Sequence, residues 1–356
     1  REEESQGRGG AQAQGGGKRL QKKQKHLYLI LDDWAKGFTI RKIDDADSPH
    51  LGDPPVLRLV APVPRRPLSF AALGSHIFAT SNGHCGTLVY DTETAGLATG
   101  PCLPDALLGG VNVFIPTAAD TLYALAYFYH GRQQSFEVMS VATGAAKGRT
   151  TTPALDWSWR SVSSCPLPFR TDEEIVSYAV HPDGRTIFVT ANTTEEDRTF
   201  SFDTKRCEWR CHGGWALPFE GQGYFDNQLE AWVGLHEDGG VCACQVISHH
   251  GSAGAMQQPD WKMVKDKLWS PNKKVALEPT LTCMGGARFC IVECVMREGL
   301  VEYEDAFGDH DGCMLHITLF GLRYNHMGEL QTLGRTTNSC PVSKHFTSFS
   351  PVAFWM

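Results

Sequence analysis

The sequence predicts an all-β fold, and more specifically a six-bladed β-propeller. Of its 356 residues, 42% are hydrophobic and 21% are charged, so the chain can bury a full core. Proline, glycine and aromatic residues are spread throughout without a long helical pattern, which favours many short strands joined by turns. A template of four strand-like segments recurs about every 40–50 residues, and this spacing is typical of propeller blades.

The first unit begins with a hairpin over residues 26–44, "HLYLILDDWAKGFTIRKID", and its third segment is 54–62. No strand-like run precedes this hairpin, whereas the run 347–355 near the end of the chain has no neighbour to pair with. Because folded proteins avoid exposed sheet edges, we expect the C-terminal strand to complete the N-terminal blade.

Each of the other five units begins with an apolar run, continues with a hairpin and ends with a shorter segment. The apolar runs are 68–73, 111–115, 175–180, 223–227 and 281–284. The hairpins are 76–92, 121–141, 186–204, 230–247 and 288–322, and the segment after the last one is 328–334.

Two of these hairpins match closely in sequence. Each has a strand that ends in Asp-Thr, at Asp91 and at Asp203, with an apolar residue six positions later. An aspartate at such a point can accept a hydrogen bond from the backbone N–H two residues on. We therefore expect the same turn at both positions.

Residues 1–25 differ in composition from the rest and are expected to form a disordered Gly/Gln/Lys-rich tail before a propeller of residues 26–356. The tail ends in a basic run that is compatible with a nuclear-import signal, or simply with a solvated tail: Lys18, Arg19, Lys22, Lys23 and Lys25. It has no charged-then-apolar signal pattern, although the chain begins with Arg1, so an upstream segment stays open.

The charge pattern argues against nucleic acid as a partner. The chain has a net charge of −7, and residues 1–25 carry more basic than acidic residues, so the body is more acidic still. Duplex binding needs a basic face. No apolar run is long enough for a membrane helix. We expect no nucleic-acid or membrane partner, and a monomer.

Twelve cysteines are present, several inside strand-like runs. Cys242 and Cys244 are two residues apart, so they should share one face of a strand. No second pair at ligand spacing suggests zinc. We interpret most cysteines as small buried hydrophobes in a reducing compartment, either cytoplasmic or nuclear, and expect no cofactor.

Three stretches could hold a metal ion, and each has a simpler interpretation. Asp32, Asp33 and Trp34 are best explained as the turn of the first hairpin, because neighbouring carboxylates on a strand face opposite ways. The loop 302–312 could ligate a hard cation but lacks the EF-hand spacing, so a solvated loop is favoured. Its candidate ligands are Glu302, Glu304, Asp305, Asp309, His310 and Asp311. His249 and His250 have no third ligand nearby in sequence.

The nine tryptophans are expected mainly to pack between blades, with one or two lining a surface that binds a partner. No nucleophile elbow, P-loop or Rossmann fingerprint is present. A copper-radical oxidase would need Tyr, Cys and His side chains to converge in the central channel, which remains a remote alternative.

Several stretches together resemble a plant family catalogued as domain of unknown function 1668, which is expanded in grasses. They are "YLILDDWAKGFTIRKID", "PPVLRLVAP", "SFAALGSHIFAT", "TLVYDTETAGLATGPCLP" and "YFDNQLEAWVGLHEDGGVCAC". The resemblance implies a plant protein with a kelch-type propeller, similar to those attached to plant F-box proteins, and implies no site residues. Two features depart from that pattern. The pairs Gly109-Gly110, Gly213-Gly214 and Gly285-Gly286 lie ahead of or within first strands, and residues 1–25 cannot hold an F-box bundle.

These observations predict a non-enzymatic protein-interaction propeller, because variable loops on a rigid frame commonly carry binding functions. The binding residues and the partner are not predicted. The alternative is an enzyme or metal-binding propeller that uses carboxylate and histidine groups at the mouth of the channel.

Overall fold

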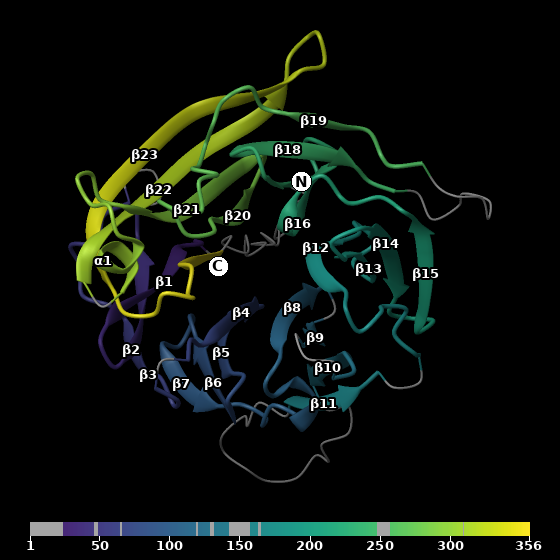
Figure 1. The fold of residues 1–356 in the computed structure, drawn as a ribbon, viewed down its shortest axis with the longest axis horizontal. Helices are drawn as coiled ribbons and strands as arrows, with labels where there is room; N and C mark the ends of the chain where they lie inside the picture. Colours follow the sequence, from purple (N-terminus) through teal and green to yellow (C-terminus); the bar gives the residue numbers. More distant parts are fainter. Residues whose placement is uncertain are drawn as a thin grey trace, which may run out of the picture.

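The computed structural model is an all-β chain with almost no helix, in which four-stranded groups are arranged around a central axis (Figure 1). This arrangement is β-propeller-like. The structure describes residues 24–45, 49–64, 66–118, 120–128, 132–141, 157–162, 165–247, 257–308 and 310–356.

The first two sheets follow the predicted pattern. In the first, the strand order is β24-β1-β2-β3, and in the second it is β4-β5-β6-β7. The strands are β1 Leu27–Trp34, β2 Gly37–Ile43, β3 Leu57–Val60, β24 Val352–Trp355, β4 Ser69–Leu73, β5 His76–Ser81, β6 His84–Asp91 and β7 Gly96–Thr99.

A 3₁₀ turn at Asp105–Leu107 leads into the third sheet, which has the order β11-β10-β9-β8. An eight-stranded sheet follows, made of two antiparallel groups of four that are joined by the parallel pair β12 and β16. The strands are β8 Val111–Thr117, β9 Thr121–Tyr127, β10 Ser135–Val141, β11 Trp157–Ser161, β12 Glu174–Val180, β13 Thr186–Asn192, β14 Asp197–Asp203, β15 Glu208–Gly213, β16 Glu220–Asp226, β17 Ala231–His236, β18 Gly240–Gln245 and β19 Trp261–Met263.

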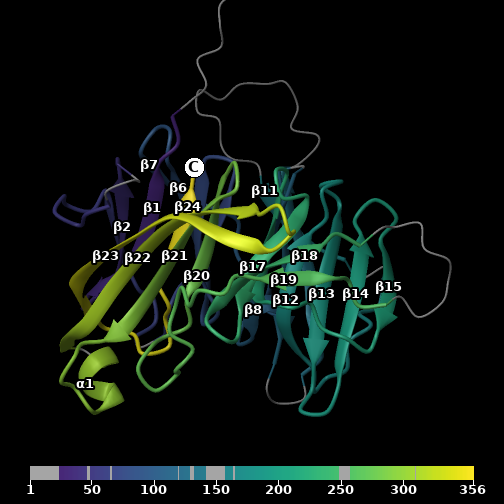
Figure 2. The ribbon, with the colours of Figure 1, turned by 90° about the horizontal axis from the view of Figure 1, so that it is seen from above.

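The last sheet, β20-β21-β22-β23, differs most from expectation. It comprises β20 Thr280–Gly285, β21 Arg288–Met296, β22 His310–Tyr324 and β23 Leu330–Lys344, with the short helix α1 Tyr303–Phe307 before β22 (Figure 2). The sequence predicted only a short segment at 328–334 where β23 runs for 15 residues. The outer strand β23 is mostly polar and few of its residues are buried, so its sequence lacks the apolar alternation by which a strand is recognised.

Strands in the middle of each sheet are buried on both faces because neighbouring sheets cover them from both sides. In β1, Leu27, Leu29 and Leu31 belong to a cluster shared with β20–β23. The alternate side chains Tyr28 and Ile30 belong to a different cluster, shared with β4–β7. This division follows the period-two alternation of a strand.

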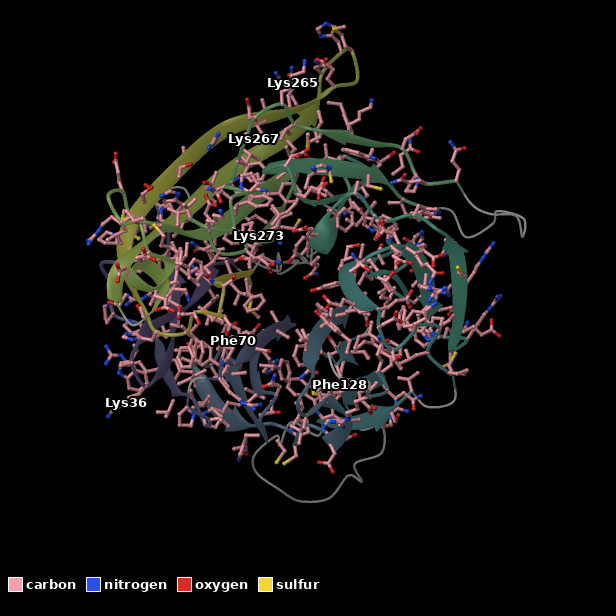
Figure 3. The ribbon with its side chains drawn as sticks, in the orientation of Figure 1. Lys36, Phe70, Phe128, Lys265, Lys267 and Lys273 are labelled. Atoms are coloured by element: carbon pink, nitrogen blue, oxygen red, sulfur yellow. The ribbon has the colours of Figure 1, made fainter. Side chains whose placement is uncertain are left out.

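Apolar clusters of this kind lie between all successive groups of four strands in the described part of the chain. Six clusters are present, and one of them joins β20–β23 back to the sheet that contains β1. Side chains fill the spaces between neighbouring sheets (Figure 3). Each group therefore packs against the next one all the way round.

The predicted pairing of the two ends of the chain is confirmed. β24 runs antiparallel to β1, with Leu27 opposite Trp355 and Ile30 opposite Val352. Just beyond these strands, the N–H and carbonyl groups of His26 and Met356 bond reciprocally, at 2.6 and 3.0 Å.

The matching turns predicted at Asp91 and Asp203 are also confirmed. Asp91 accepts a hydrogen bond from the N–H of Glu93, and Asp203 accepts one from the N–H of Lys205. Four residues after each aspartate, Ala95 and Cys207 have positive φ angles of 55° and 54°. Equal local sequence thus gives equal local geometry.

Candidate functional site

The residues Asp32, Asp33 and Trp34 do not form a turn, so that prediction was wrong. Strand β1 continues through Trp34, with an irregularity between Leu31 and Trp34, and pairs across to Gly37. Asp33 accepts hydrogen bonds from Thr39 and Arg41 on β2. The two carboxylates do point apart, as expected, because Asp32 has entirely different partners.

Asp32 forms a buried ion pair with Lys344, the last residue of β23. The Lys344 Nζ atom donates to Asp32 at 2.7 Å and to the carbonyls of Phe346 and Phe349 at 2.9 and 2.6 Å. The same carboxylate accepts the N–H groups of His345 and Phe346. This network holds the segment between β23 and β24 in place. The Asp32–Lys344 pair therefore has a structural role.

The predicted acidic loop is partly helical. Glu302, Glu304 and Asp305 are exposed at or near α1, while Asp309 and the side chains of His310 and Asp311 lie outside the described residues. His249, His250, Lys18, Arg19, Lys22 and Lys23 also lie outside them. Within the described part, no three His, Cys, Asp or Glu side chains are grouped so as to hold a metal ion.

Most described tryptophans pack in the core, as predicted. Trp232 is fully buried, and its indole N–H donates to the carbonyl of Val180. Trp157 packs on Phe78 between two sheets. Trp355 is different, because it comes from β24 and lines two cavities near the central axis.

The first of these cavities lies in the central channel and has a volume of about 260 Å³. All of the innermost strands contribute to it, namely β4, β8, β12, β16, β20 and β24. Its larger or polar lining residues are Phe70, Phe114, Tyr178, Gln222, Tyr224, Thr282, Cys283, Phe354, Trp355 and Met356. The channel is therefore aromatic, with a few neutral polar groups.

The ionisable side chains that line the channel are neutral near pH 7. Burial raises the pKa of Tyr178, Tyr224 and Cys283 above their ordinary values. The Tyr178 hydroxyl lies 3.4 Å from the side-chain oxygen of Gln222. The described lining contains no histidine, aspartate or glutamate side chain, so the Tyr-Cys-His combination of a copper-radical oxidase is not assembled there.

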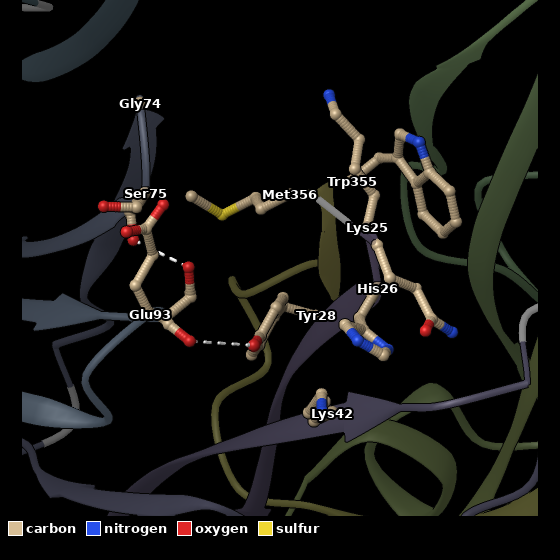
Figure 4. Close-up of a pocket in the computed structure, with 11 residues that line it drawn as sticks. Lys25, His26, Tyr28, Lys42, Gly74, Ser75, Glu93, Trp355 and Met356 are labelled. Carbon is tan, nitrogen blue, oxygen red and sulfur yellow. Dashed lines mark hydrogen bonds between the residues drawn. The ribbon is translucent and has the colours of Figure 1, made fainter. Parts of the chain in front are cut away.

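The second cavity, of about 340 Å³, opens beside the channel and is called here the mouth pocket (Figure 4). It lies between the sheet of β1 and the sheet of β4. Its lining is Gln24, Lys25, His26, Tyr28, Lys42, Gly74, Ser75, Thr92, Glu93, Trp355 and Met356. Gly74, Trp355 and Met356 also line the channel cavity, so the two spaces adjoin.

The start of β1 and its partner strands position the side chains of the mouth pocket. Tyr28 lies opposite Lys42 in the β1–β2 register, and its hydroxyl donates to the carbonyl of Thr92 at 3.4 Å. Lys42 is paired with Asp44 at 2.9 Å, and Lys25 is exposed. The pocket thus presents two lysines and the carboxylate of Glu93 next to aromatic surface.

Sequence reasoning missed Tyr178, Gln222 and Tyr224. All three lie within or beside the apolar runs predicted as the first strand of a unit, so their place near the axis was implied. Which of the alternating side chains would face the channel could not be deduced, because that depends on how neighbouring units pack.

Residues 24–340 match a family described as protein of unknown function, DUF1668. The chain belongs to this family. No curated protein is similar enough to this DUF1668 chain to match it. No described helix has the length and apolar character needed to cross a membrane.

Among solved structures, this DUF1668 chain is similar to TolB from Acinetobacter baumannii, with 12% identity and a TM-score of 0.49 over 93% of the chain but only 66% of TolB. A chain of the nidogen/laminin complex gives 8% identity and a TM-score of 0.48, covering 93% and 98% of the two chains. The periplasmic gluconolactonase of Pseudomonas aeruginosa gives 12% and 0.43, covering 90% and 99%. These likenesses carry no conclusion about activity.

Proposed function

We propose that this chain is a six-bladed β-propeller that works as a non-enzymatic protein-interaction module. The blade count is supported by dividing the eight-stranded sheet at the parallel pair of β12 and β16, which are the first strands of two successive groups. It is also supported by the apolar clusters between successive groups. A plant origin and a kelch-like relationship are part of the same proposal and come from the family resemblance.

The observation that carries the binding proposal is the continuity of the mouth pocket with the aromatic channel. Trp355 belongs to both spaces, and Lys25 and Lys42 lie at the entrance. An apolar or aromatic side chain of a partner fits the channel, while an acidic neighbour on the same segment pairs with the lysines. Aromatic surface in a concave site is a common anchor point for a protein partner.

The test is quantitative affinity purification from plant tissue. It compares the proteins captured by two variants that have the same change in net charge. Lys25→Glu with Lys42→Glu alters the entrance. Lys36→Glu with Lys265→Glu makes the same charge change on exposed lysines elsewhere, in the β1–β2 turn and at the outer rim (Figure 3).

A protein captured by the wild type and by the rim variant should fall at least about tenfold with the entrance variant, equivalent to about 1.4 kcal/mol of binding. Circular dichroism checks that both variants fold. Equal capture by all three proteins, or no capture above background, would overturn the proposal.

We further propose a cytoplasmic or nuclear location, which is supported by twelve free cysteines and by the basic run that includes Lys25. Replacing the five basic residues of that run by glutamine in a fluorescent fusion should reduce nuclear accumulation. Equal accumulation of both forms would rule out the import signal.

A further inference from the structure

Two thiols lie in contact at the surface of the sheet β4–β7. Cys85 is half-buried on β6, and Cys102 is exposed just after β7. The Cys85 thiol is close enough to the Cys102 thiol to raise its pKa. Neither residue belongs to the channel or to the mouth pocket.

The backbone register explains why these thiols meet. Leu88 is opposite Thr99 in the β6–β7 pair, and the N–H of Gly100 donates to the carbonyl of Thr87 at 2.9 Å. Counted along that register, Cys102 is the position opposite Cys85, just beyond the last regular pair. Facing Cα atoms in a regular antiparallel pair are about 4.5–5.5 Å apart, and a disulfide spans about 4.4–6.8 Å, so a neighbouring position with a small irregularity is still within reach.

One more hydrogen bond holds the two segments together beyond the end of β7. The N–H of Leu103 donates to the carbonyl of Cys85 at 2.7 Å, one residue out of the β6–β7 register. Cys102 therefore sits as an extra residue that faces Cys85 at the surface.

A second pair of thiols provides a contrast inside the same molecule. Cys294 and Cys313 are also in contact, on β21 and β22, but both are fully buried in an apolar cluster. A water-borne oxidant cannot reach them without unfolding. Cys207 is exposed, but its thiol is directed at the carbonyl of Thr204. The Cys85 and Cys102 thiols, by contrast, lie next to each other and can be reached from solvent.

We propose that Cys85 and Cys102 form a reversible disulfide site, which is closed by exchange with a small disulfide such as oxidised glutathione. The proposal rests on the facing register, the contact and the exposure, and it is independent of the proposed function.

The exchange is balanced in two steps. The Cys102 thiolate attacks one sulfur of the oxidised glutathione, forming a mixed disulfide and releasing one glutathione thiolate. The Cys85 thiolate then attacks the Cys102 sulfur, closing the protein disulfide and releasing the second glutathione. Two electrons pass from the protein to the glutathione, and the protons of the two cysteine thiols end on the two released glutathiones.

Closing this bond would fix the connection between two sheets. The segment after Cys102 places Leu103 and Leu107 in the buried cluster between β4–β7 and β8–β11, and Gly109 donates its N–H to the carbonyl of Asn82. The disulfide would hold this segment to β6. Because the Cys85 sulfur raises the pKa of the Cys102 thiol, the exchange proceeds faster in mildly alkaline buffer.

The test incubates the full chain with oxidised glutathione in mildly alkaline buffer, followed by counting of accessible thiols and by peptide mapping without reduction. The wild type should yield a peptide linked through Cys85 and Cys102 that is two hydrogen atoms lighter than the sum of the two free peptides, whatever adducts form at the other exposed cysteines. Adding a dithiol reductant should restore both thiols.

Two single variants make the result specific. Cys102→Ser should give no linked peptide, whereas the matched exposed variant Cys207→Ser should still give the Cys85–Cys102 link. A wild type that carries only mixed glutathione adducts, or a link through other cysteines, would overturn the proposal. Because the mapping is done on the wild type itself, the result does not depend on the folding of any variant.

Discussion

The Nζ atom of Lys344 lies 2.7 Å from Oδ2 of Asp32, and the two side chains are 0% and 2% exposed. These residues are 312 positions apart in the chain. Asp32 is close to the end of β1 and Lys344 ends β23, so the pair joins the sheets where the two ends of the chain meet. The pair lies at the opposite end of β1 from the mouth pocket, since Tyr28 lines that pocket near the start of the strand.

Breaking this pair should strongly destabilise the fold. Asp32→Asn leaves the Lys344 ammonium buried without its counter-charge, for which we expect a loss of about 3–5 kcal/mol in the free energy of unfolding. Lys344→Met in turn leaves the Asp32 carboxylate buried without its counter-charge. Urea unfolding followed by tryptophan fluorescence measures both losses.

The double variant Asp32→Asn with Lys344→Met should lose at least about 1 kcal/mol less than the sum of the two single losses, because residues in direct contact are not additive. Lys265→Met serves as the control, since Lys265 is 82% exposed in its pair with Glu329 and should change stability by no more than about 0.5 kcal/mol. Additive single losses would contradict the coupling that the geometry indicates.

Removing the C-terminal strand should be as damaging as breaking the ion pair. Deletion of residues 347–356 takes away β24 and leaves the edge of β1 unpaired. It also removes the carbonyls of Pro351 and Ala353, which accept hydrogen bonds from Thr280 and Thr282 at 2.8 Å. We expect the cooperative thermal transition to be lost, as judged by circular dichroism. A truncated chain that melts within about 2 °C of the full chain would contradict this expectation.

The channel tyrosines should not ionise in the folded protein. Burial raises the pKa of Tyr178 and Tyr224 above the ordinary value of 10.0. Their contribution to stability is therefore complete below about pH 10 and is lost as the pH rises towards the folded pKa, because the unfolded chain then releases protons first.

Ultraviolet titration of wild type and of Tyr178→Phe with Tyr224→Phe tests this directly. The number of tyrosines that ionise in the folded chain should be the same in both proteins. After unfolding in denaturant, two fewer should ionise in the variant, out of nine in the wild type. If the folded variant already showed two fewer, the channel would be open to water and the pKa argument would be wrong.

The features that the sequence predicts correctly are those set by local pattern. Middle strands such as β1 and β9 contain continuous apolar runs, and the turns at Asp91 and Asp203 follow from side-chain hydrogen bonds within a few residues. Cys242 and Cys244 do share one cluster, as their spacing requires. The remaining features depend on residues far apart in the chain.

Three features that the sequence did not reveal show this dependence on distant residues. Asp32 looked like a turn residue because its partner, Lys344, is at the other end of the chain. Strand β23 lacks alternation because β22 supplies its pairing and solvent covers its outer side. The contact of Cys85 with Cys102 depends on a register that no hydrophobic pattern reveals.

Asp183 and Asp238 give a last comparison, since each follows a histidine by two residues in a tight turn between strands. Asp183 is 19% exposed and accepts the N–H groups of Arg185 and Thr186, each at 2.9 Å, and the Thr186 hydroxyl at 2.8 Å. Burial alone would raise the pKa of its carboxyl, but these donors outweigh burial and hold the pKa well below 3.8. Asp238 is 61% exposed.

Asp183→Asn should therefore lose roughly 1–2 kcal/mol of stability near pH 7, as hydrogen bonds to a charged group are weakened. Asp238→Asn, in the same local sequence context, should lose less than about 0.5 kcal/mol. A depressed folded pKa stabilises the protein above the ordinary value of 3.8 and loses that effect as the pH falls towards the folded pKa. Denaturant unfolding across the acid range should accordingly show the Asp183→Asn deficit shrinking as the pH falls, and a deficit that stayed constant would mean that the charge of Asp183 contributes nothing.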